Sequence, residues 1–356
     1  MTIWIILGVI SIIAAIAAVT VIPALGRAPR GARLERIMKS PNWRDGQFHN
    51  LSETPTITSG KMSMKTMWKF IAMKKRKDRV PESPVDAVKT DLTQLDMTRD
   101  QIVWFGHSSY LLVIGGKTFL VDPVLAPTFP FSLSLKAFRG TDIYRPEDMP
   151  HVDYLIITHD HYDHLDYKTV KTIRERVNQV FCPLGVGEHL EYWGYNPEKI
   201  TELDWNESVA ICNKLSEVSK INCLPSRHFS GRALKRDNTL WASFMIEYGG
   251  RTVYIGGDGG YDSHFADIGN RFTDIDLALM DNGQYDENWR YIHTMPEMLT
   301  LAIHDLGAKI VQPVHNSKYA LANHAWDEPM RKIQEAAKSD STIHLLGASL
   351  GEVKEC

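Results

Sequence analysis

The 356-residue sequence is poor in cysteine and has little net charge, with no low-complexity tract and no short-period repeat. Its four cysteines are Cys182, Cys212, Cys223 and Cys356, and no two have C-x-x-C spacing. Four such residues in a chain this long exclude a disulfide framework, so we expect reduced thiols, with Cys182, Cys212 and Cys223 in or near the core. The net charge of −3 gives no indication of nucleic-acid binding. A hydrophobic content of 44% is ordinary for a globular chain of one large or two smaller domains.

Charged side chains are absent from residues 1–26, where a long apolar run suits the ~20 residues that cross a bilayer. A cleaved signal peptide is the alternative, because Ala-x-Ala-like sites occur at 15–17, but the basic start of such peptides is missing. The run is followed directly by Arg27, Arg30, Arg33 and Arg36. Under the positive-inside tendency, we expect a single-pass membrane anchor with the rest of the chain in the cytoplasm.

Residues 27–98 carry mixed charge and little strand periodicity, and we interpret them as a linker and N-terminal extension. Within them, 61–77 alternates basic residues with methionine and aromatic residues. This segment either lies on anionic lipid as a basic amphipathic element, or packs its Met and Trp face on the main domain. Both alternatives stay open, and they are compatible with each other.

From residue 99 onward the pattern changes to short apolar strands, Gly-Gly turns and helices. The sequence predicts strands at 101–105, 109–114, 117–121, 154–158, 244–248, 252–255, 277–280 and 309–314, and helices at 167–177 and 296–306. In each half a hairpin comes first and strand–helix alternation follows. This order predicts an α/β fold for residues 99–356: a four-layer αββα sandwich of two mixed sheets with an internal pseudo-repeat.

The densest group of potential ligands follows the apolar run 154–157. Residues 158–166 hold three histidines and three acids, among them His159, His161, Asp163 and His164. Imidazole and carboxylate ligands together suit zinc, iron or manganese. Because four ligands from one loop seldom saturate one ion without strain, two adjacent ions are the more natural interpretation.

Two further residues have the same setting, in a turn or just past a predicted strand. Asp258 lies within a Gly-Gly-Asp-Gly-Gly turn, where glycines allow close approach of the backbone. His315 follows the strand predicted at 309–314, and His228 offers one more imidazole between the loop 158–166 and Asp258.

This spacing resembles the metallo-β-lactamase superfamily, and within it the branch of N-acyl phosphatidylethanolamine-hydrolysing phospholipase D and its bacterial relatives. The resemblance covers about residues 99 to 335. The matching stretches are Trp104–Ser109, Asp122–Val124, His159–Asp166, His228–Arg232, Gly257–Tyr261 and Trp326–Pro329. The chain departs from the branch at Asp281-Asn282-Gly283 and at Asn316-Ser317-Lys318-Tyr319, which we expect to flank the site mouth and to affect substrate identity.

The resemblance implies two divalent metal ions, zinc in the first instance, with iron or manganese as alternatives. It implies that one ion is held by three histidines, the other by an aspartate and two histidines, and that one carboxylate bridges them. These sets are His159, His161 and His228; Asp163, His164 and His315; and Asp258 as the bridge. We expect Asp163 and Asp258 to be the catalytic carboxylates. The formal charge of such a site stays positive, which favours an anionic phosphodiester.

Four other residues are candidates for supporting roles or substrate contacts. Asp122 is either a hydrogen-bond acceptor for a ligating histidine or a turn carboxylate before proline. His107 either lines the cavity or caps a strand. His293 and His324 either reach the site as phosphate ligands or proton donors, or are surface histidines. We interpret Asp160 and Asp166 as residues that orient the loop, with Asp166 also able to cap the following helix.

The sequence therefore predicts a membrane-anchored, dinuclear metal-dependent hydrolase that acts on a phosphodiester. The most plausible substrate is a phospholipid such as N-acyl phosphatidylethanolamine, cleaved as by a phospholipase D, with membrane lipid as the partner. The alternative is a hydrolase of a soluble lactone or other small ester. A scaffold protein with a vestigial site is a third class, which the intact ligand set disfavours. A lipid enzyme would also have an apolar groove at its site mouth.

Overall fold

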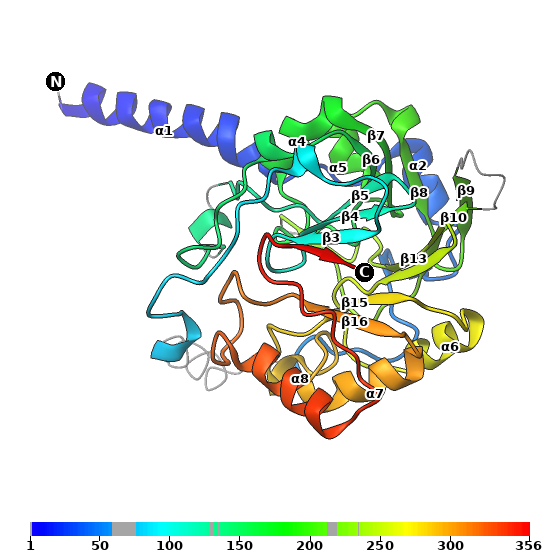
Figure 1. Cartoon of the computed structure of the whole chain (residues 1–356). Helices are drawn as coiled ribbons and strands as arrows, with labels where there is room; N and C mark the ends of the chain where they lie inside the picture. Colours follow the sequence, from blue (N-terminus) through cyan, green and yellow to red (C-terminus); the bar gives the residue numbers. More distant parts are fainter. Residues whose placement is uncertain (1, 59–75, 129–130, 134, 212–218, 234) are drawn as a thin grey trace.

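The computed structural model describes residues 2–58, 76–128, 131–133, 135–211, 219–233 and 235–356. Two β-sheets pack face to face, and helices cover the outer face of each (Figure 1). This is the predicted four-layer αββα sandwich, and the two sheets also confirm the predicted order of elements. Each combines antiparallel pairs formed early in its half with parallel pairs formed later.

The first sheet has the strand order β17-β3-β4-β5-β6-β7-β8. Pairing is antiparallel from β17 to β5 and parallel from β5 to β8. Its strands are β3 (Gln101–Trp104), β4 (Tyr110–Ile114), β5 (Lys117–Val121), β6 (Val152–Ile156), β7 (Val177–Pro183), β8 (Ile200–Leu203) and β17 (Val353–Glu355).

The second sheet has the order β16-β15-β14-β13-β10-β9, antiparallel from β9 to β14 and parallel from β14 to β16. Its strands are β9 (Ser208–Ile211), β10 (Ser219–Leu224), β13 (Ser243–Tyr248), β14 (Arg251–Ile255), β15 (Leu277–Asp281) and β16 (Ile310–Val314). The two-stranded hairpins are β1 (Trp43–Arg44) with β2 (Gln47–Phe48), and β11 (Gly231–Arg232) with β12 (Lys235–Arg236).

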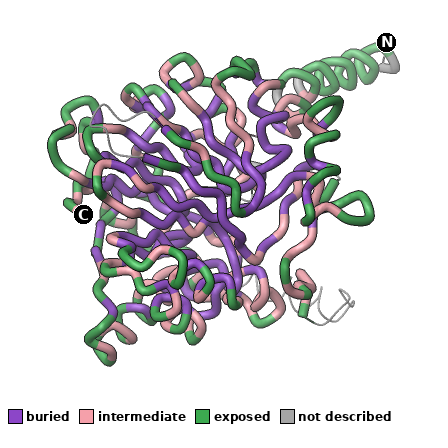
Figure 2. The backbone as a smooth tube through the Cα atoms, turned by 90° about the vertical axis from the view of Figure 1, so that its right-hand side faces the viewer, coloured by how far each residue is buried: buried purple, intermediate pink, exposed green. Residues whose placement is uncertain are grey.

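Side-chain alternation along the strands divides the core into three layers. One set, including Leu112, Phe119 and Phe244, fills the space between the two sheets. The opposite faces pack under helices, with Leu155 beneath α4 and α5 and Met245 beneath α6, α7 and α8. Figure 2 shows the resulting buried interior and the exposed outer turns. Both faces of these strands are buried, as continuous apolar runs require.

The helices are α1 (Thr2–Ala24), α2 (Gly31–Ile37), α4 (Tyr167–Ile173), α5 (Gly187–Tyr192), α6 (His264–Arg271), α7 (Pro296–Leu306) and α8 (Glu328–Ser339). Short 3-10 turns lie at Lys77–Arg79, Leu92–Gln94, Phe131–Leu133, Pro146–Asp148, Arg174–Arg176, Pro197–Lys199 and Glu287–Trp289. The helix predicted at 167–177 is shorter than expected, because a 3-10 turn follows Ile173 and Val177 already begins β7.

The N-terminal helix α1 projects away from the body, as Figure 1 shows. Within the described residues, it is long and apolar enough to cross a membrane: Trp4–Ala24 has a mean hydropathy of 3.0. The basic residues behind it are not all free. Arg27 pairs with Glu188 at 2.5 Å, and Arg33 pairs with Glu188 at 2.5 Å and with Glu202. The end of α1 is thus fixed to the sandwich by ion pairs.

The cysteines of the described chain are free thiols, as predicted: Cys182 and Cys223 are buried and Cys356 is half-buried. Cys212 and the basic segment 61–77, apart from its last two residues, lie outside the described residues.

Close packing of α6 on α7 gives a first testable prediction. A methyl group at Gly269 would lie 2.1 Å from the Asp305 carbonyl oxygen, so Gly269→Ala forces the two helices apart. We expect a loss of about 2 kcal/mol in the free energy of unfolding, since overpacking typically costs this much. Urea denaturation of the detergent-solubilised chain measures it. In the control Gly231→Ala the methyl meets its nearest atom at 3.5 Å; equal losses in both variants would contradict the packing argument.

Candidate metal centre

The ligand-rich loop 158–166 begins where β6 ends, and Asp122 at the end of β5 supports it. The Asp122 carboxylate is buried and accepts hydrogen bonds from the Thr158 backbone N–H (2.8 Å) and hydroxyl (2.6 Å). It also lies 2.7 Å from His164 Nδ1. With Nδ1 donating to this carboxylate, the lone pair of His164 Nε2 is directed into the site.

Three imidazoles form a first cluster at the start of the loop. His161 Nδ1 lies 2.9 Å from His159 Nε2 and 3.2 Å from His228 Nε2. The far nitrogens of the other two rings are held by oxygens. His228 Nδ1 bonds the Ile292 carbonyl at 2.7 Å, and His159 Nδ1 bonds the Thr158 hydroxyl at 3.0 Å. Each ring thus presents a lone pair to the same point, as metal-binding histidines do.

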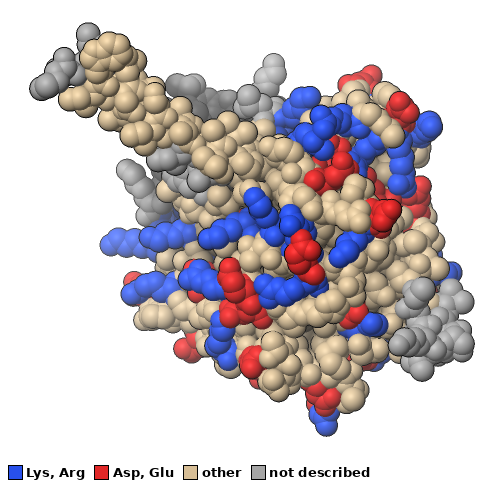
Figure 3. Space-filling model, turned by 90° about the horizontal axis from the view of Figure 1, so that it is seen from above, with Lys and Arg blue, Asp and Glu red and all other residues tan. Residues whose placement is uncertain are grey.

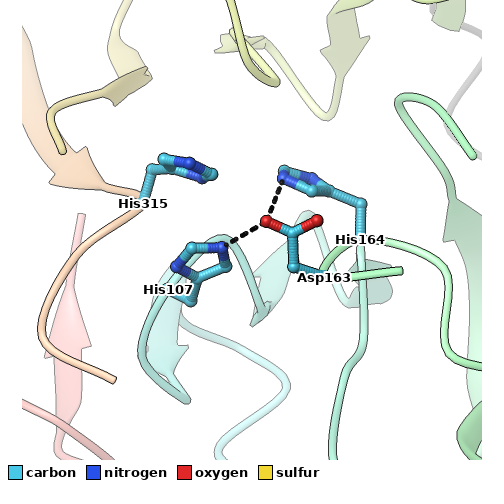
Figure 4. A group of neighbouring side chains, drawn as sticks. All are labelled: His107, Asp163, His164 and His315. Atoms are coloured by element: carbon cyan, nitrogen blue, oxygen red, sulfur yellow. Dashed lines mark hydrogen bonds and ion pairs between the residues drawn. The ribbon is translucent and has the colours of Figure 1, made fainter. Parts of the chain in front are cut away.

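A second cluster comprises His107, Asp163, His164 and His315, and Figure 4 shows these side chains converging from the loops that follow β3, β6 and β16. His107 Nε2 bonds Asp163 Oδ2 at 3.0 Å, and the His107 ring lies 4.1 Å from that of His315. His315 has a positive φ of 65°, which turns its ring into the site immediately after β16.

The Asp258 carboxylate lies between the two clusters. Oδ1 is 2.9 Å from His315 Nδ1 and 3.1 Å from His164 Nε2, while Oδ2 is 3.8 Å from His228 Nε2. Burial alone would raise the pKa of Asp258, but the His164 and His315 rings outweigh burial and hold it well below its usual range. The group is therefore an anion that faces both clusters, as a bridging carboxylate would.

Buried polar atoms without hydrogen bonds test whether the residues fit metal ions. Among the described residues, they include His315 Nε2, and also His164 Nε2 and Asp258 Oδ1, which lie 3.1 Å apart but not in hydrogen-bond geometry. A buried polar atom without a partner is uncommon in a folded protein and calls for an explanation such as an ion. Because these atoms belong to the converging clusters, the donor set fits two cations held by imidazole and carboxylate.

His107 is part of the second cluster and is fully buried. Burial lowers its pKa, the neighbouring His315 lowers it further, and the value falls to about 3 despite the Asp163 carboxylate. The ring is therefore neutral at physiological pH. It can donate one hydrogen bond to Asp163 and so fix the direction of that carboxylate.

The two loop histidines take different positions. His293 lines the cavity, with Nδ1 3.1 Å from Asp281 Oδ2 and its ring 5.2 Å from that of His228. His324 has both ring nitrogens engaged with backbone, accepting from the Gln284 N–H at 2.9 Å and donating to the Ala325 carbonyl at 2.8 Å. Neither nitrogen of His324 is thus directed at a substrate, although the ring positions Gln284, which lines the cavity.

Asp160 and Asp166 fix the back of the loop. Asp166 is the N-cap of α4 and accepts from Thr169 N–H at 3.0 Å, which confirms the predicted cap. Asp160 accepts from Gly231 N–H at 2.9 Å and lies 3.2 Å from His189 Nε2. His189 in turn accepts from the Arg27 N–H at 3.0 Å. A hydrogen-bonded chain therefore joins the end of the N-terminal helix to the ligand loop.

A buried guanidinium forms a second link between the same two elements. Arg232 donates to the carbonyls of Asp160 (2.7 Å) and Leu165 (2.8 Å), which lie at either end of the ligand cluster. Its other nitrogens donate to the Ala24 carbonyl at 3.1 and 3.0 Å, at the C-terminus of α1. The Tyr162 ring stacks on the guanidinium at 4.1 Å.

This network gives a second prediction, for Arg232→Lys. An ammonium group keeps the charge but cannot reach all these carbonyls, and each lost charge-assisted bond is worth about 1.5–3 kcal/mol. We expect the free energy of unfolding to fall by about 3 kcal/mol, measured by urea denaturation. Arg236→Lys, on the exposed partner strand, is the control and should change stability little. Equal stabilities would contradict the role of the guanidinium.

The cavity above both clusters has a volume of about 300 Å³ and a largely apolar wall. Its apolar lining residues are Ile57, Phe229, Trp289, Ile292 and Leu321. The N-terminal extension contributes Thr56 and Ile57 to the cavity. Its Asn50 side chain donates to the His228 carbonyl at 2.7 Å and accepts from the His228 N–H at 3.1 Å. These residues were not predicted from the sequence, because the extension has no periodicity or motif that marks them.

The stretches that depart from the resembled branch lie mainly behind the cavity. Asn316 and Lys318 are buried, and Asn316 donates to the carbonyls of Asn282 (3.1 Å) and Val314 (2.9 Å). Gly283 packs so closely that a methyl group would lie 2.2 Å from the His315 carbonyl oxygen. These residues fix the backbone around His315, while Gln284 and Leu321 next to them reach the cavity.

An αββα sandwich with imidazole and carboxylate clusters at its strand ends defines the class of metal-dependent hydrolases built on the metallo-β-lactamase fold. The family comparison agrees: residues 117–316 match the model described as the β-lactamase superfamily domain. The chain belongs to the β-lactamase superfamily and is a metal-dependent hydrolase of that family.

Several known proteins are similar in sequence. An uncharacterised Mycobacterium tuberculosis protein is 36% identical over 85% of this chain and 81% of its own. The N-acyl-phosphatidylethanolamine-hydrolyzing phospholipase D 1 of Caenorhabditis elegans is 30% identical over 69% of this chain and 73% of its own.

Solved structures share the fold. The metallo hydrolase Igni18 of Ignicoccus hospitalis superposes with a TM-score of 0.52 at 20% identity, covering 72% of this chain and 97% of its own. The diiron β-hydroxylase CmlA of Streptomyces venezuelae gives 0.52 at 20% identity, with 72% of this chain and 54% of that chain covered.

Proposed function

We propose that this protein is a membrane-anchored, dinuclear metal-dependent phosphodiesterase that cleaves a phospholipid such as N-acyl phosphatidylethanolamine in the manner of a phospholipase D. The observation that carries the proposal is the cavity. Five of the seven proposed ligands lie at its floor, namely His161, Asp163, His228, Asp258 and His315, and its wall is apolar and suited to lipid. The likeness to the C. elegans phospholipase D supports this substrate class.

In this proposal, His159, His161 and His228 would hold one metal ion, Asp163, His164 and His315 would hold the other, and Asp258, which lies between the two clusters, would contact both. Two such ions would supply positive charge and lower the pKa of water towards about 7, which provides a nucleophile at neutral pH. Zinc suits this mixed donor set, and iron or manganese are the alternatives.

The chain's own residues orient the groups that react. Asp122 fixes the tautomer of His164, and neutral His107 fixes the direction of the Asp163 carboxylate. The apolar wall excludes water and holds the lipid, while Arg236, stacked on Phe229 at 4.5 Å, offers a cation at the rim. In the reaction, the oxygen of water bonds to phosphorus and the bond from phosphorus to the ethanolamine oxygen breaks.

The N-terminal helix would hold this cavity at a membrane. It is uncharged and has a mean hydropathy of 3.0, and Arg27, Arg33 and Arg232 fix its end to the sandwich. In the proposed topology α1 is a single span with the hydrolase domain on the cytoplasmic side. The active site then keeps a fixed orientation to the bilayer that holds its substrate.

Product analysis tests the function. The full chain in neutral detergent, loaded with zinc, is incubated with N-acyl phosphatidylethanolamine, bis-p-nitrophenyl phosphate and a panel of lactones in ¹⁸O-water. We expect phosphatidic acid that carries ¹⁸O on phosphorus, together with unlabelled N-acylethanolamine. Lactone turnover without phosphodiester turnover would overturn the proposal in favour of a small-ester hydrolase.

The apolar wall provides a third prediction. Ile57→Ser with Leu321→Ser removes two apolar side chains from the wall while leaving the ligand clusters intact. Each apolar side chain buried against lipid is worth about 1.5–3 kcal/mol, so KM for N-acyl phosphatidylethanolamine should rise at least about tenfold. KM for bis-p-nitrophenyl phosphate, which has no acyl chain, is the internal control. A parallel rise for both substrates would contradict a lipid-binding wall.

A further inference from the structure

A second, larger cavity lies outside the metal centre, next to the end of α1. Its volume is about 500 Å³, and it is formed by described residues of 126–127, 132 and 135–145 together with Lys168 of α4 and Tyr319. Most of its lining belongs to the β5–β6 connection, whose described residues form 3-10 turns but no α-helix or strand. Nothing in the proposed hydrolysis uses this cavity.

The cavity is strongly basic. Four cations and a single carboxylate line it: Lys136, Arg139, Arg145, Lys168 and Asp142. Arg145 pairs with Asp142 at 3.3 Å, so that carboxylate is already engaged. Lys136 and Lys168 form no ion pair with any residue of the described chain, and both are exposed. Figure 3 shows Lys and Arg side chains gathered on the flank beside α1. An anion placed here would meet several unneutralised cations.

The interior of the cavity is apolar. Leu135, Phe138 and Tyr319 line it and are buried. Leu135 and Tyr319 belong to a cluster that Leu321 also joins, and Leu321 lines the metal cavity. The Tyr319 ring is 5.1 Å from that of His107. One apolar wall thus separates the basic cavity from the metal centre, so that the two sites lie back to back.

The location relative to α1 indicates the source of the anion. A smaller cavity shares Pro127 and Leu135 with the basic one and is lined by Ala24, the last residue of α1. Helix α1 also packs against α4, which carries Lys168. If α1 spans a bilayer, its end lies at the headgroup level, where anionic lipid attracts Lys and Arg within a Debye length.

We propose that this basic cavity binds the phosphorylated headgroup of an anionic bilayer phospholipid that is not the substrate. The cations would contact its phosphate, and the apolar floor would take the glycerol and the first acyl carbons. This inference rests on the membrane insertion of α1, which is part of the proposed function, but not on hydrolysis at the metal centre. The bound lipid would hold the sandwich against the bilayer on the side where the basic cavity and the end of α1 lie.

The test measures binding of soluble, short-chain lipid to the full chain in a neutral detergent. The probe is dihexanoyl-phosphatidylglycerol, titrated by calorimetry after chelation and in the His161→Ala background, so that neither binding at the metals nor turnover contributes. Dihexanoyl-phosphatidylcholine and inorganic phosphate are the comparison ligands. The pocket variant is Lys136→Glu with Lys168→Glu. The control is Lys220→Glu with Lys338→Glu, which makes the same charge change at exposed sites on β10 and α8.

We expect saturable binding of phosphatidylglycerol, at least tenfold weaker binding of phosphatidylcholine, and weak binding of free phosphate. The pocket variant should lose at least tenfold in affinity, because each cation near an anionic lipid contributes roughly fivefold. The control should not change. Equal affinity in the pocket and control variants would overturn the proposal. Phosphate binding as tight as phosphatidylglycerol binding would also overturn it, in favour of a soluble anion.

A second measurement separates this inference from the proposed function. Lys136→Glu with Lys168→Glu is made in a chain that keeps His161, and its hydrolysis of bis-p-nitrophenyl phosphate is measured. Unchanged turnover alongside lost lipid binding shows that the cavity is a separate site in a folded enzyme. Lipid binding by a wild-type chain that hydrolyses no phosphodiester would overturn the proposed function and leave this inference standing.

Discussion

His161→Ala is expected to reduce kcat/KM for bis-p-nitrophenyl phosphate by about three orders of magnitude or more. The variant would lose a metal ligand, and the attacking water would no longer have its pKa lowered by roughly nine units through metal binding. The ring of His161 contacts both other imidazoles of its cluster, at 2.9 and 3.2 Å. Its removal leaves two imidazoles where three converged. Steady-state kinetics of the zinc-loaded chain measure the effect.

His151→Ala is the matched control. His151 is exposed, its backbone carbonyl accepts from the Thr118 hydroxyl at 3.1 Å, and its ring has no hydrogen bond or ion pair with the described residues. We expect its kinetics to equal those of the wild type. Activity that survives both His161→Ala and chelation would show that hydrolysis does not depend on this cluster.

Asp122→Asn has the second largest expected effect, and it acts without touching substrate. The carboxylate lies 2.7 Å from His164 Nδ1 and accepts two bonds from Thr158. An amide keeps the shape but removes the charge that makes His164 a better ligand. Substitutions of this kind typically weaken metal affinity by about 10–100-fold. Competition with a zinc chelator should show this loss, with zinc excess restoring most of kcat.

Asp153→Asn distinguishes positioning from simple stabilisation. Asp153 is also largely buried at a strand of the first sheet, where it bonds Lys117 at 2.7 Å and Thr118 at 3.1 Å, but it faces no ligand. This variant should lose stability and keep its zinc affinity. If both variants lost only stability, Asp122 would be a structural turn residue and no more.

Local sequence patterns were sufficient to predict much of the sandwich. Apolar runs such as 117–121 and 277–280 form strands where expected, because burial on both faces requires continuous apolar side chains. The strands of 177–224 were not predicted. In β8 and β9 polar residues such as Glu202 and Ser208 interrupt the apolar pattern, and tertiary packing decides their conformation.

The residues of the metal site also fall into those that a local sequence pattern predicts and those that it does not. The ligand loop and the Asp166 cap are visible in the sequence because their residues are adjacent. The contacts of Asn50 with His228 and of Arg232 with Ala24 join residues that lie 178 and 208 positions apart, and no local pattern records such pairs. The basic cavity was missed for this reason too, since its cations come from the β5–β6 connection and from α4.

Metal stoichiometry tests whether the two clusters, joined by Asp258, form one dinuclear hydrolytic centre. The chain is stripped with chelator, titrated with zinc, and analysed by mass spectrometry for metal per chain together with activity. We predict two zinc ions per wild-type chain, with activity restored only as the second ion binds, and one or fewer in Asp258→Asn. Full activity with a single ion, or without any, would contradict the account.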